Sequence, residues 1–401
     1  MAKSLTSLWL KNMRRMGKAQ QAQGRQLLMS LIPKPSRAVR PALVRQSKPA
    51  KIAKAKTIPK AAKAARPKAI KPLRQPPALA VRPAKELPGS WKKAFFSISP
   101  KVHLTTARRM LYWLYVPSGV AKGPRPLVVM LHGCQQTATE FAAATRMNKL
   151  AERRGFAVLY PQQSAATDSH RCWHWYKRAT QQGLGDVTLI AEMVAQVQAR
   201  HGLDASRTYV AGLSAGAGLA AILALRHPQL IAAVGLHSAP VFGTSDSSFS
   251  AFKAMQHGSS LAHRVTAHEF AAAQPQFPGI PVMLLHGKRD AVVRPINMDQ
   301  LTTQFAIINA PFITRADPVR RSYPGRVGGR SPRHAYQTVT YYAGRKPEVV
   351  RCEIDSLGHA WSGGDGSMAF SAPEGPDATL LLWNFFSRQK RTQKAPAAVK
   401  S

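Results

Sequence analysis

The stretch YVAGLSAGAG, residues 209–218, joins an apolar run to a serine that stands between small residues. Gly212 and Gly216 flank Ser214 in a G-x-S-x-G pattern, and the helix-like run LAAILALRHP follows directly. This pattern marks a strand that turns sharply into a helix, with the serine held at the tip of the turn. Three fixed positions are a moderate signal, which the flanking strand and helix strengthen. The stretch predicts a nucleophilic serine if the rest of the chain supplies its partners.

Strand-like and helix-like segments alternate from about Leu111 onward. Residues 186–201 have apolar side chains at helical spacing and an acid at the start, so they predict an amphipathic helix capped by Asp186. The β-rich runs of this region are MLYWLYVP, PLVVMLHG, FAVLYPQ, IAAVGLHSAP, PVMLLHGKRD, VTYYAG and EVVRCEID. The alternation predicts an α/β fold with a mostly parallel central sheet flanked by helices.

Two segments interrupt this alternation, and LLLWNFFSRQ closes it as a predicted helix. Residues from about Phe242 to Pro278 are numerous enough to cover a site at the edge of the sheet. The arginine-rich residues 315–334 are predicted to form an exposed insertion.

A serine hydroxyl needs an imidazole to take its proton, and the imidazole needs a carboxylate to fix its tautomer. After a G-x-S-x-G turn, the expected chain order is serine, acid, histidine. Asp290 follows the strand-like PVMLLHG, and His359 lies at the glycine turn DSLGHAWSGG after the last strand-like run. Because both follow strands, we expect them at the same sheet edge as Ser214. Ser214, Asp290 and His359 are therefore the predicted catalytic residues.

Acyl transfer also needs N–H donors for the oxyanion. The backbone N–H of Ala215, which follows the serine, is one candidate, and that of Cys134, in the strand exit LHGCQQ, is the other. The alternative for LHGC is an ordinary tight strand exit. His132 and His286 each lie in an LHG at a strand end, where we expect local hydrogen bonds, whereas His237 is a candidate pocket residue.

The 401-residue chain is strongly basic, with 58 Lys and Arg against 18 Asp and Glu. Residues 1–86 carry 22 basic side chains and a single acid, Glu86, and are rich in Lys, Ala and Pro. Such a composition predicts a disordered arm, because like charges repel and few residues can form a core. We expect a catalytic domain at 87–388 and a basic disordered tail at 389–401. A solvated linker and a binding arm both remain open for the first segment.

The extreme N-terminus differs from the rest of the arm. Leu5, Trp9 and Met13 fall near helical spacing among basic residues, which predicts a short amphipathic helix within 4–30. No apolar run has the length of a signal-peptide core or of a transmembrane segment. We therefore expect a cytoplasmic protein, associated with polyester granules, with an extracellular location as the alternative. The arm's expected partners are a granule surface, DNA or polyphosphate, between which the sequence does not choose.

Three cysteines, Cys134, Cys172 and Cys352, are too few for a disulfide scaffold and lack metal-ligand spacing. No metal or other cofactor is expected. A Cys134–Cys172 bridge stays open, although a cytosolic setting would favour thiols.

Together the motifs resemble the esterase family of poly(3-hydroxybutyrate) depolymerases. Those that carry the resemblance are PLVVMLHGCQQTATEF, CWHWY, GLSAGA, LLHGKRDAVVRPIN and LGHAWSGG, in the family's order, over roughly residues 93–387. The resemblance implies an α/β-hydrolase fold with the triad named above, and Cys134 in the oxyanion loop. The intact GLSAG and the expected lack of a signal peptide favour the intracellular branch. Secreted members usually append a substrate-binding domain, where this chain has the basic arm.

The leading hypothesis is a serine esterase that hydrolyses poly(3-hydroxybutyrate) or its oligomers. A feruloyl or acetyl esterase acting on polysaccharides is the alternative within the same family. A third hypothesis is a tethering protein for granules or nucleic acid with secondary esterase activity. Trp173, Trp175 and Trp361 are predicted to line an apolar groove for the substrate, with core packing as their alternative role.

Overall fold

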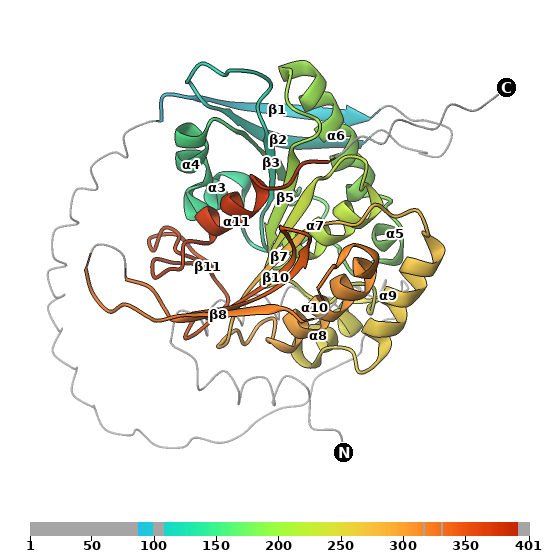
Figure 1. Cartoon of the computed structure of the whole chain (residues 1–401). Helices are drawn as coiled ribbons and strands as arrows, with labels where there is room; N and C mark the ends of the chain where they lie inside the picture. The colour runs from blue at the N-terminus through green and yellow to red at the C-terminus, as the bar shows by residue number, and fades with distance from the viewer. Residues whose placement is uncertain (1–86, 99–107, 316, 330–331, 392–401) are drawn as a thin grey trace, which may run out of the picture. The chain divides into compact units, whose positions relative to one another are not determined.

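The computed structural model describes residues 87–98, 108–315, 317–329 and 332–391 (Figure 1). The predicted arm at 1–86, with its amphipathic helix, and most of the predicted tail lie outside these residues. The predicted location and the predicted partners of the arm depend on that segment. In the part of the chain that the structure describes, no helix is both long and apolar enough to cross a bilayer.

A ten-stranded sheet organises the described residues, in the order β1-β2-β4-β3-β5-β6-β7-β10-β9-β8. Its six inner strands are parallel: β3 (Leu127–Leu131), β4 (Ala157–Gln162), β5 (Thr208–Leu213), β6 (Ala233–His237), β7 (Val282–Gly287) and β10 (Lys346–Ile354). Antiparallel strands close both sides, β1 (Ser90–Ile98) and β2 (Arg108–Val116) on one, β8 (Val319–Tyr323) and β9 (Tyr336–Ala343) on the other. Every residue of β3 to β7 is buried, as expected for strands covered on both faces.

Helices cover the two faces of the sheet and make two apolar layers (Figure 1). One layer contains α6 (Asp186–His201), α7 (Ala215–Arg226), α8 (Ser248–His257), α9 (Ala262–Ala273) and α10 (Ile296–Ile308). The other contains α3 (Ala138–Thr145), α4 (Met147–Arg154) and α11 (Ala378–Phe386). Along β3, Val129 packs in the first layer and Val128 in the second, because successive side chains of a strand point to opposite faces. Smaller elements are α5 (Arg178–Gln181), the 3-10 turn Ala310–Phe312, β11 (Trp361–Ser362) and β12 (Ser371–Ala372).

Several local predictions need correction. Helix α6 has the predicted bounds, but Gly185 is its N-cap, and the Asp186 carboxylate accepts from Arg108 (2.6 Å) and Gln163 (2.8 Å) instead of capping. The segment from Phe242 to Pro278 contains the helices α8 and α9. The predicted insertion at 315–334 includes β8, which is an exposed edge strand of the sheet. Strand β1 was not predicted.

The C-terminal boundary of the folded body also lies later than 388. Gln389 is buried and its side chain donates to the Pro347 carbonyl at 2.7 Å, while its own carbonyl accepts from the Tyr209 hydroxyl at 2.7 Å. The backbone N–H of Arg391 donates to Ser206 at 2.9 Å. At least residues 389–391 therefore belong to the body.

Candidate active site

Ser214 occupies a strained turn between β5 and α7. Its φ is 57° and its ψ is −122°, which a residue with a side chain rarely adopts. A Cβ on Gly212 would lie 2.4 Å from the backbone of Gly216, and one on Gly216 would lie 2.1 Å from the Leu131 carbonyl oxygen. The two glycines are thus required sterically: one lets the turn close, and the other lets it approach the end of β3.

Strand β6 supports this turn through a buried histidine. The Ser214 N–H donates to the His237 carbonyl at 3.0 Å, and the His237 ring stacks on Trp361 with a centroid distance of 5.1 Å. The Ser362 N–H donates to His237 Nε2 at 3.2 Å. Burial lowers the pKa of His237 to about 3, so the ring is neutral and accepts this bond. His237, predicted as a pocket residue, lies beneath the serine turn and shows no exposed surface.

Asp290 and His359 come together at the carboxyl ends of β7 and β10, although 69 residues separate them in sequence. His359 Nδ1 lies 2.8 Å from Asp290 Oδ2, so a proton on Nδ1 leaves Nε2 free to accept another. The other oxygen, Oδ1, accepts the N–H groups of Val292 (3.0 Å) and Val293 (2.9 Å). Burial opposes ionisation of Asp290, but His359 and these donors outweigh it and hold the pKa of the carboxyl below its usual range.

The loop after β3 leaves one backbone donor free near the serine. The Gly133 N–H donates to Gln136 Oε1 (2.9 Å), that of Gln135 to His170 (2.6 Å), and that of Gln136 to Gly133 (3.4 Å). Among the described residues, the Cys134 N–H has no hydrogen-bond partner. A Cβ built on Gly133 would lie 3.7 Å from the Ser214 Cβ, so this loop is adjacent to the serine.

Ala215 supplies a comparable donor on the other side. It is the first residue of α7, where backbone N–H groups have no partner within the helix and the helix dipole favours negative charge. The predicted donors, Cys134 and Ala215, thus lie on the two segments that meet at Ser214. This arrangement can stabilise charge that develops on a carbonyl oxygen attacked by the serine.

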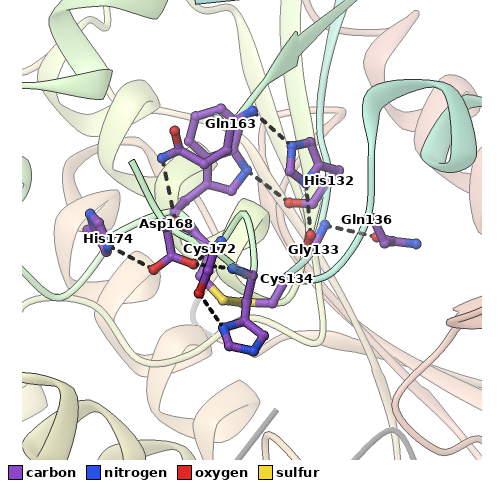
Figure 2. The surroundings of a disulfide bond; sticks show 11 residues. His132, Gly133, Cys134, Gln136, Gln163, Asp168, Cys172 and His174 are labelled. Carbon is purple, nitrogen blue, oxygen red and sulfur yellow. Dashed lines mark hydrogen bonds and ion pairs between the residues drawn. A yellow bond between two sulfur atoms is a disulfide. The ribbon is translucent and has the colours of Figure 1, made fainter. Parts of the chain in front are cut away.

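A disulfide fixes the Cys134 loop. Cys134 and Cys172 are bonded, with their Cα atoms 4.3 Å apart (Figure 2). The loop that carries Cys172 folds around Asp168, whose carboxylate accepts from the N–H groups of His170 (2.9 Å) and Cys172 (3.1 Å) and lies 3.1 Å from His174 Nε2. Burial opposes ionisation of Asp168, but these contacts keep the pKa of the carboxyl low. The bridge that the sequence left open is therefore present, and it ties the loop to a second, internally bonded loop.

The predicted tryptophans contribute to packing. Trp173 donates from Nε1 to the His132 carbonyl (2.9 Å), and Trp361 donates to the Thr379 hydroxyl (3.1 Å). Trp175 packs so closely on α7 that a Cβ on Gly218 would lie 2.9 Å from its ring. The exposed fraction of each tryptophan is 4% or less, so none presents a ring face to solvent. The geometry favours the core-packing alternative over a substrate groove.

Three side chains that support the Cys134 loop were missed by sequence reasoning: Gln136 and Gln163, which are buried, and Asp168, which is partly exposed. The Gln163 N–H donates to His132 Nε2 at 3.1 Å and thereby anchors the end of β3 to the end of β4. Glutamine and aspartate in loops are common, so only their tertiary partners distinguish these positions. For Gln136 a signal existed, since it stands four residues after the histidine of an LHG, as Asp290 does.

Comparison with known proteins identifies relatives of the chain. The family model described as "Esterase PHB depolymerase" matches residues 110–327, a little over half of the chain. Poly(3-hydroxyalkanoate) depolymerase C of Paucimonas lemoignei is 32% identical over 251 residues, 61% of this chain and 57% of that protein. A probable acetylxylan esterase A of Neosartorya fischeri is 28% identical over 233 residues, 55% of this chain and 62% of that protein. The chain thus spans less than two thirds of the length of either relative.

A solved structure supports the fold. The acetyl xylan esterase from Aspergillus awamori aligns over 73% of this chain and 99% of its own length, with a TM-score of 0.56 and 20% sequence identity. This likeness confirms the predicted α/β-hydrolase fold class. The family match ends at residue 327, so it includes Ser214 and Asp290 but not His359.

Proposed function

Because the chain belongs to the Esterase PHB depolymerase family, we propose that it is a serine esterase that acts on 3-hydroxyalkanoate esters through Ser214, His359 and Asp290. The observation that carries the proposal is the 2.8 Å hydrogen bond between His359 Nδ1 and Asp290 Oδ2, at the sheet edge where Ser214 stands. A carboxylate in this position orients the imidazole and stabilises its protonated form.

In the proposed reaction, Ser214 Oγ attacks the ester carbonyl carbon while His359 Nε2 takes the hydroxyl proton. The Cys134 and Ala215 N–H groups stabilise the negative charge on the carbonyl oxygen. The bond to the alkoxy oxygen then breaks, and His359 returns the proton to the departing alcohol. Water, deprotonated by His359, attacks the acyl-serine and releases the acid with regeneration of Ser214. Asp290 stays ionised throughout, which its low pKa supports.

The test of the mechanism is the substitution Ser214→Ala. We expect kcat/KM on a p-nitrophenyl ester and on 3-hydroxybutyrate trimer to fall at least about 10⁴-fold, because the nucleophile is lost. Ser206→Ala, which changes a serine at the opposite end of β5, is the matched control and should retain activity. Full activity of the Ser214→Ala protein would refute the proposal.

An acetyl ester on a polysaccharide is the second candidate substrate, because the relatives named as acetylxylan esterases share the fold and part of the sequence. The preference for 3-hydroxyalkanoate esters rests on the higher identity to the depolymerase. Turnover of 3-hydroxybutyrate trimer and of acetylated xylan by the same preparation separates the candidates. Faster release of acetate would overturn the preferred substrate and leave the catalytic proposal intact.

A further inference from the structure

A cationic cavity lies beside the oxyanion loop and is used by none of the steps above. It has a volume of about 650 Å³ and is bounded by β1 and β2 on one side and by the segments after β3 and β4 on the other. Its charged lining comprises Lys93, Arg108, Arg109, Arg171 and Asp186. The lining therefore contains four cations and one carboxylate.

That carboxylate neutralises only one of the cations. Asp186 is buried and accepts from Arg108 at 2.6 Å and from the Gln163 amide at 2.8 Å. Lys93, Arg109 and Arg171 have no ion-pair partner in the part of the chain that the structure describes. The cavity thus carries about three uncompensated positive charges, which favour an anionic ligand.

The chain itself offers little to neutralise these charges. Outside the described residues the sequence contains a single acidic side chain, Glu86. Arg109 is held in place by the Phe95 ring, with its guanidinium carbon 3.7 Å from the ring centroid. A planar guanidinium binds a carboxylate through two parallel hydrogen bonds. We therefore expect the anion to come from a ligand.

The cavity and the catalytic loop share the same supporting residues. Thr137, in the cavity wall, directly follows Gln136 of the oxyanion loop, and Arg171 directly precedes Cys172 of the disulfide. Gln163 lines the cavity and also bonds to His132, at the base of that loop. Since β4 is the neighbour of β3 on the side away from β5, the cavity lies across the oxyanion loop from Ser214.

We propose that this cavity binds the terminal carboxylate of a short linear oligoester whose scissile carbonyl lies at Ser214. The inference rests on the proposed function and adds a substrate class to it: short acids with a free carboxyl end, in preference to neutral esters of the same length. The carboxylate belongs to the fragment that leaves as the alcohol. It stays bound by the arginines until His359 has protonated the alkoxy oxygen.

The test compares linear 3-hydroxybutyrate trimer as the free acid with its methyl ester, using the full-length protein. The measured quantity is the ratio of kcat/KM for the acid to that for the ester. We expect a ratio above one for the unmodified protein, and a fall of about tenfold, or about 1.4 kcal/mol, in Arg171→Gln, because one charge-assisted contact is lost. Arg109→Gln, on a strand away from the disulfide, should lower the ratio in the same direction by about threefold.

Arg320→Gln is the matched control, because it removes an exposed arginine from β8 at the opposite edge of the sheet. Its ratio should equal that of the unmodified protein. An unchanged ratio in both Arg171→Gln and Arg109→Gln overturns the inference while leaving the esterase proposal standing. Failure of the unmodified protein to cleave either trimer, with activity on p-nitrophenyl esters retained, overturns the 3-hydroxyalkanoate assignment and the inference together.

Discussion

The tripeptide Leu-His-Gly occurs twice, at residues 131–133 and 285–287, and each copy ends a buried parallel strand. The turn that follows is the same in both: the N–H of Gln136 donates to the Gly133 carbonyl (3.4 Å), and the N–H of Asp290 donates to the Gly287 carbonyl (3.1 Å). The fourth residue after the histidine therefore occupies an equivalent position in the two turns.

The two turns nevertheless serve opposite electrostatic purposes. The Gln136 amide oxygen accepts the N–H of Gly133, and the neighbouring Cys134 N–H, which has no partner among the described residues, can face an anion. The Asp290 carboxylate instead reaches His359 and collects two further N–H groups, so it supplies negative charge. The two turns have a similar backbone, but the first presents an N–H donor and the second a carboxylate. The difference follows from the side chain at the fourth position after the histidine, which is Gln136 in one turn and Asp290 in the other.

The histidines differ in the same way. His132 Nε2 accepts the Gln163 N–H, so its proton lies on Nδ1, beside the Gly133 carbonyl at 2.8 Å. His286 Nε2 lies 2.7 Å from the Val293 carbonyl, so its proton is on Nε2. Burial lowers the pKa of both rings, that of His132 to about 4, and keeps them neutral. The Leu-His-Gly motif therefore places each histidine at the end of a strand, whereas the residues that contact the ring decide which nitrogen carries the proton.

The substitution Asp290→Asn gives the second turn an amide in place of its carboxylate, as the first turn has at Gln136. We expect kcat to fall by a factor on the order of 10³–10⁴, because an amide can hold His359 in the wrong tautomer and cannot stabilise its charge. Steady-state kinetics on a p-nitrophenyl ester measures the loss. The control is Asp299→Asn, the same exchange on α10, where the carboxylate is half exposed and pairs with Arg351. Similar losses in both variants would contradict the assigned role of Asp290.

Replacing the glycine by alanine should lower the free energy of unfolding by different amounts in the two Leu-His-Gly turns. A Cβ on Gly287 would lie 2.2 Å from the Leu357 carbonyl, in the backbone that leads to His359. A Cβ on Gly133 would lie no closer than 3.2 Å to any neighbour, at the Gln136 side chain, with the Leu213 carbonyl oxygen at 3.4 Å and the Ser214 Cβ at 3.7 Å. We therefore expect Gly287→Ala to lower the free energy of unfolding by about 3 kcal/mol or more, and Gly133→Ala by less than about 1.5 kcal/mol. Urea denaturation of both proteins measures these losses. Equal losses would show that the backbone around Gly287 shifts to make room for the added methyl group, which contradicts the prediction.

The last expected effect appears only in acid and concerns proton binding by His132. Its folded pKa of about 4 lies below the ordinary value of 6.5, so the unfolded chain takes up this proton at a higher pH than the folded chain. The ring thus favours folding above pH 6.5, and that contribution is lost as the pH falls toward 4, at about 1.4 kcal/mol per pH unit. His132→Asn should flatten the pH dependence of unfolding by that slope over this window. Parallel curves for the two proteins would contradict it.

Some of this site could be predicted because its steric requirements are local. A serine at a positive φ needs small neighbours, which is why G-x-S-x-G between an apolar strand and a helix indicates the turn. Asp290 and His359 were predicted as partners because strand ends in a parallel sheet meet at one edge, and the structure brings these two side chains together. Their catalytic roles remain predictions for the kinetic experiments.

Other features depended on contacts between distant residues. Asp186 was wrongly predicted to cap α6, because Arg108, 78 residues away, binds its carboxylate. Residues 139–155, TEFAAATRMNKLAERRG, have the pattern of a single helix in sequence, but Arg146 adopts a left-handed conformation and separates α3 from α4. The tryptophans were predicted to line a groove, but tertiary contacts bury them. Trp173 donates to the His132 carbonyl, Trp175 packs on α7, and Trp361 stacks on His237.

The α/β alternation, the serine turn and the order of its partners can be predicted from the sequence alone, because strand periodicity and glycine sterics act over a few residues. Only the tertiary contacts show that the Cys134 N–H has no partner among the described residues, that Cys134 and Cys172 are bonded, and that four cations line the cavity beside them. These features depend on which loops the sheet order places side by side. Residues far apart in the chain meet there, and burial strengthens the electrostatic consequences of each contact.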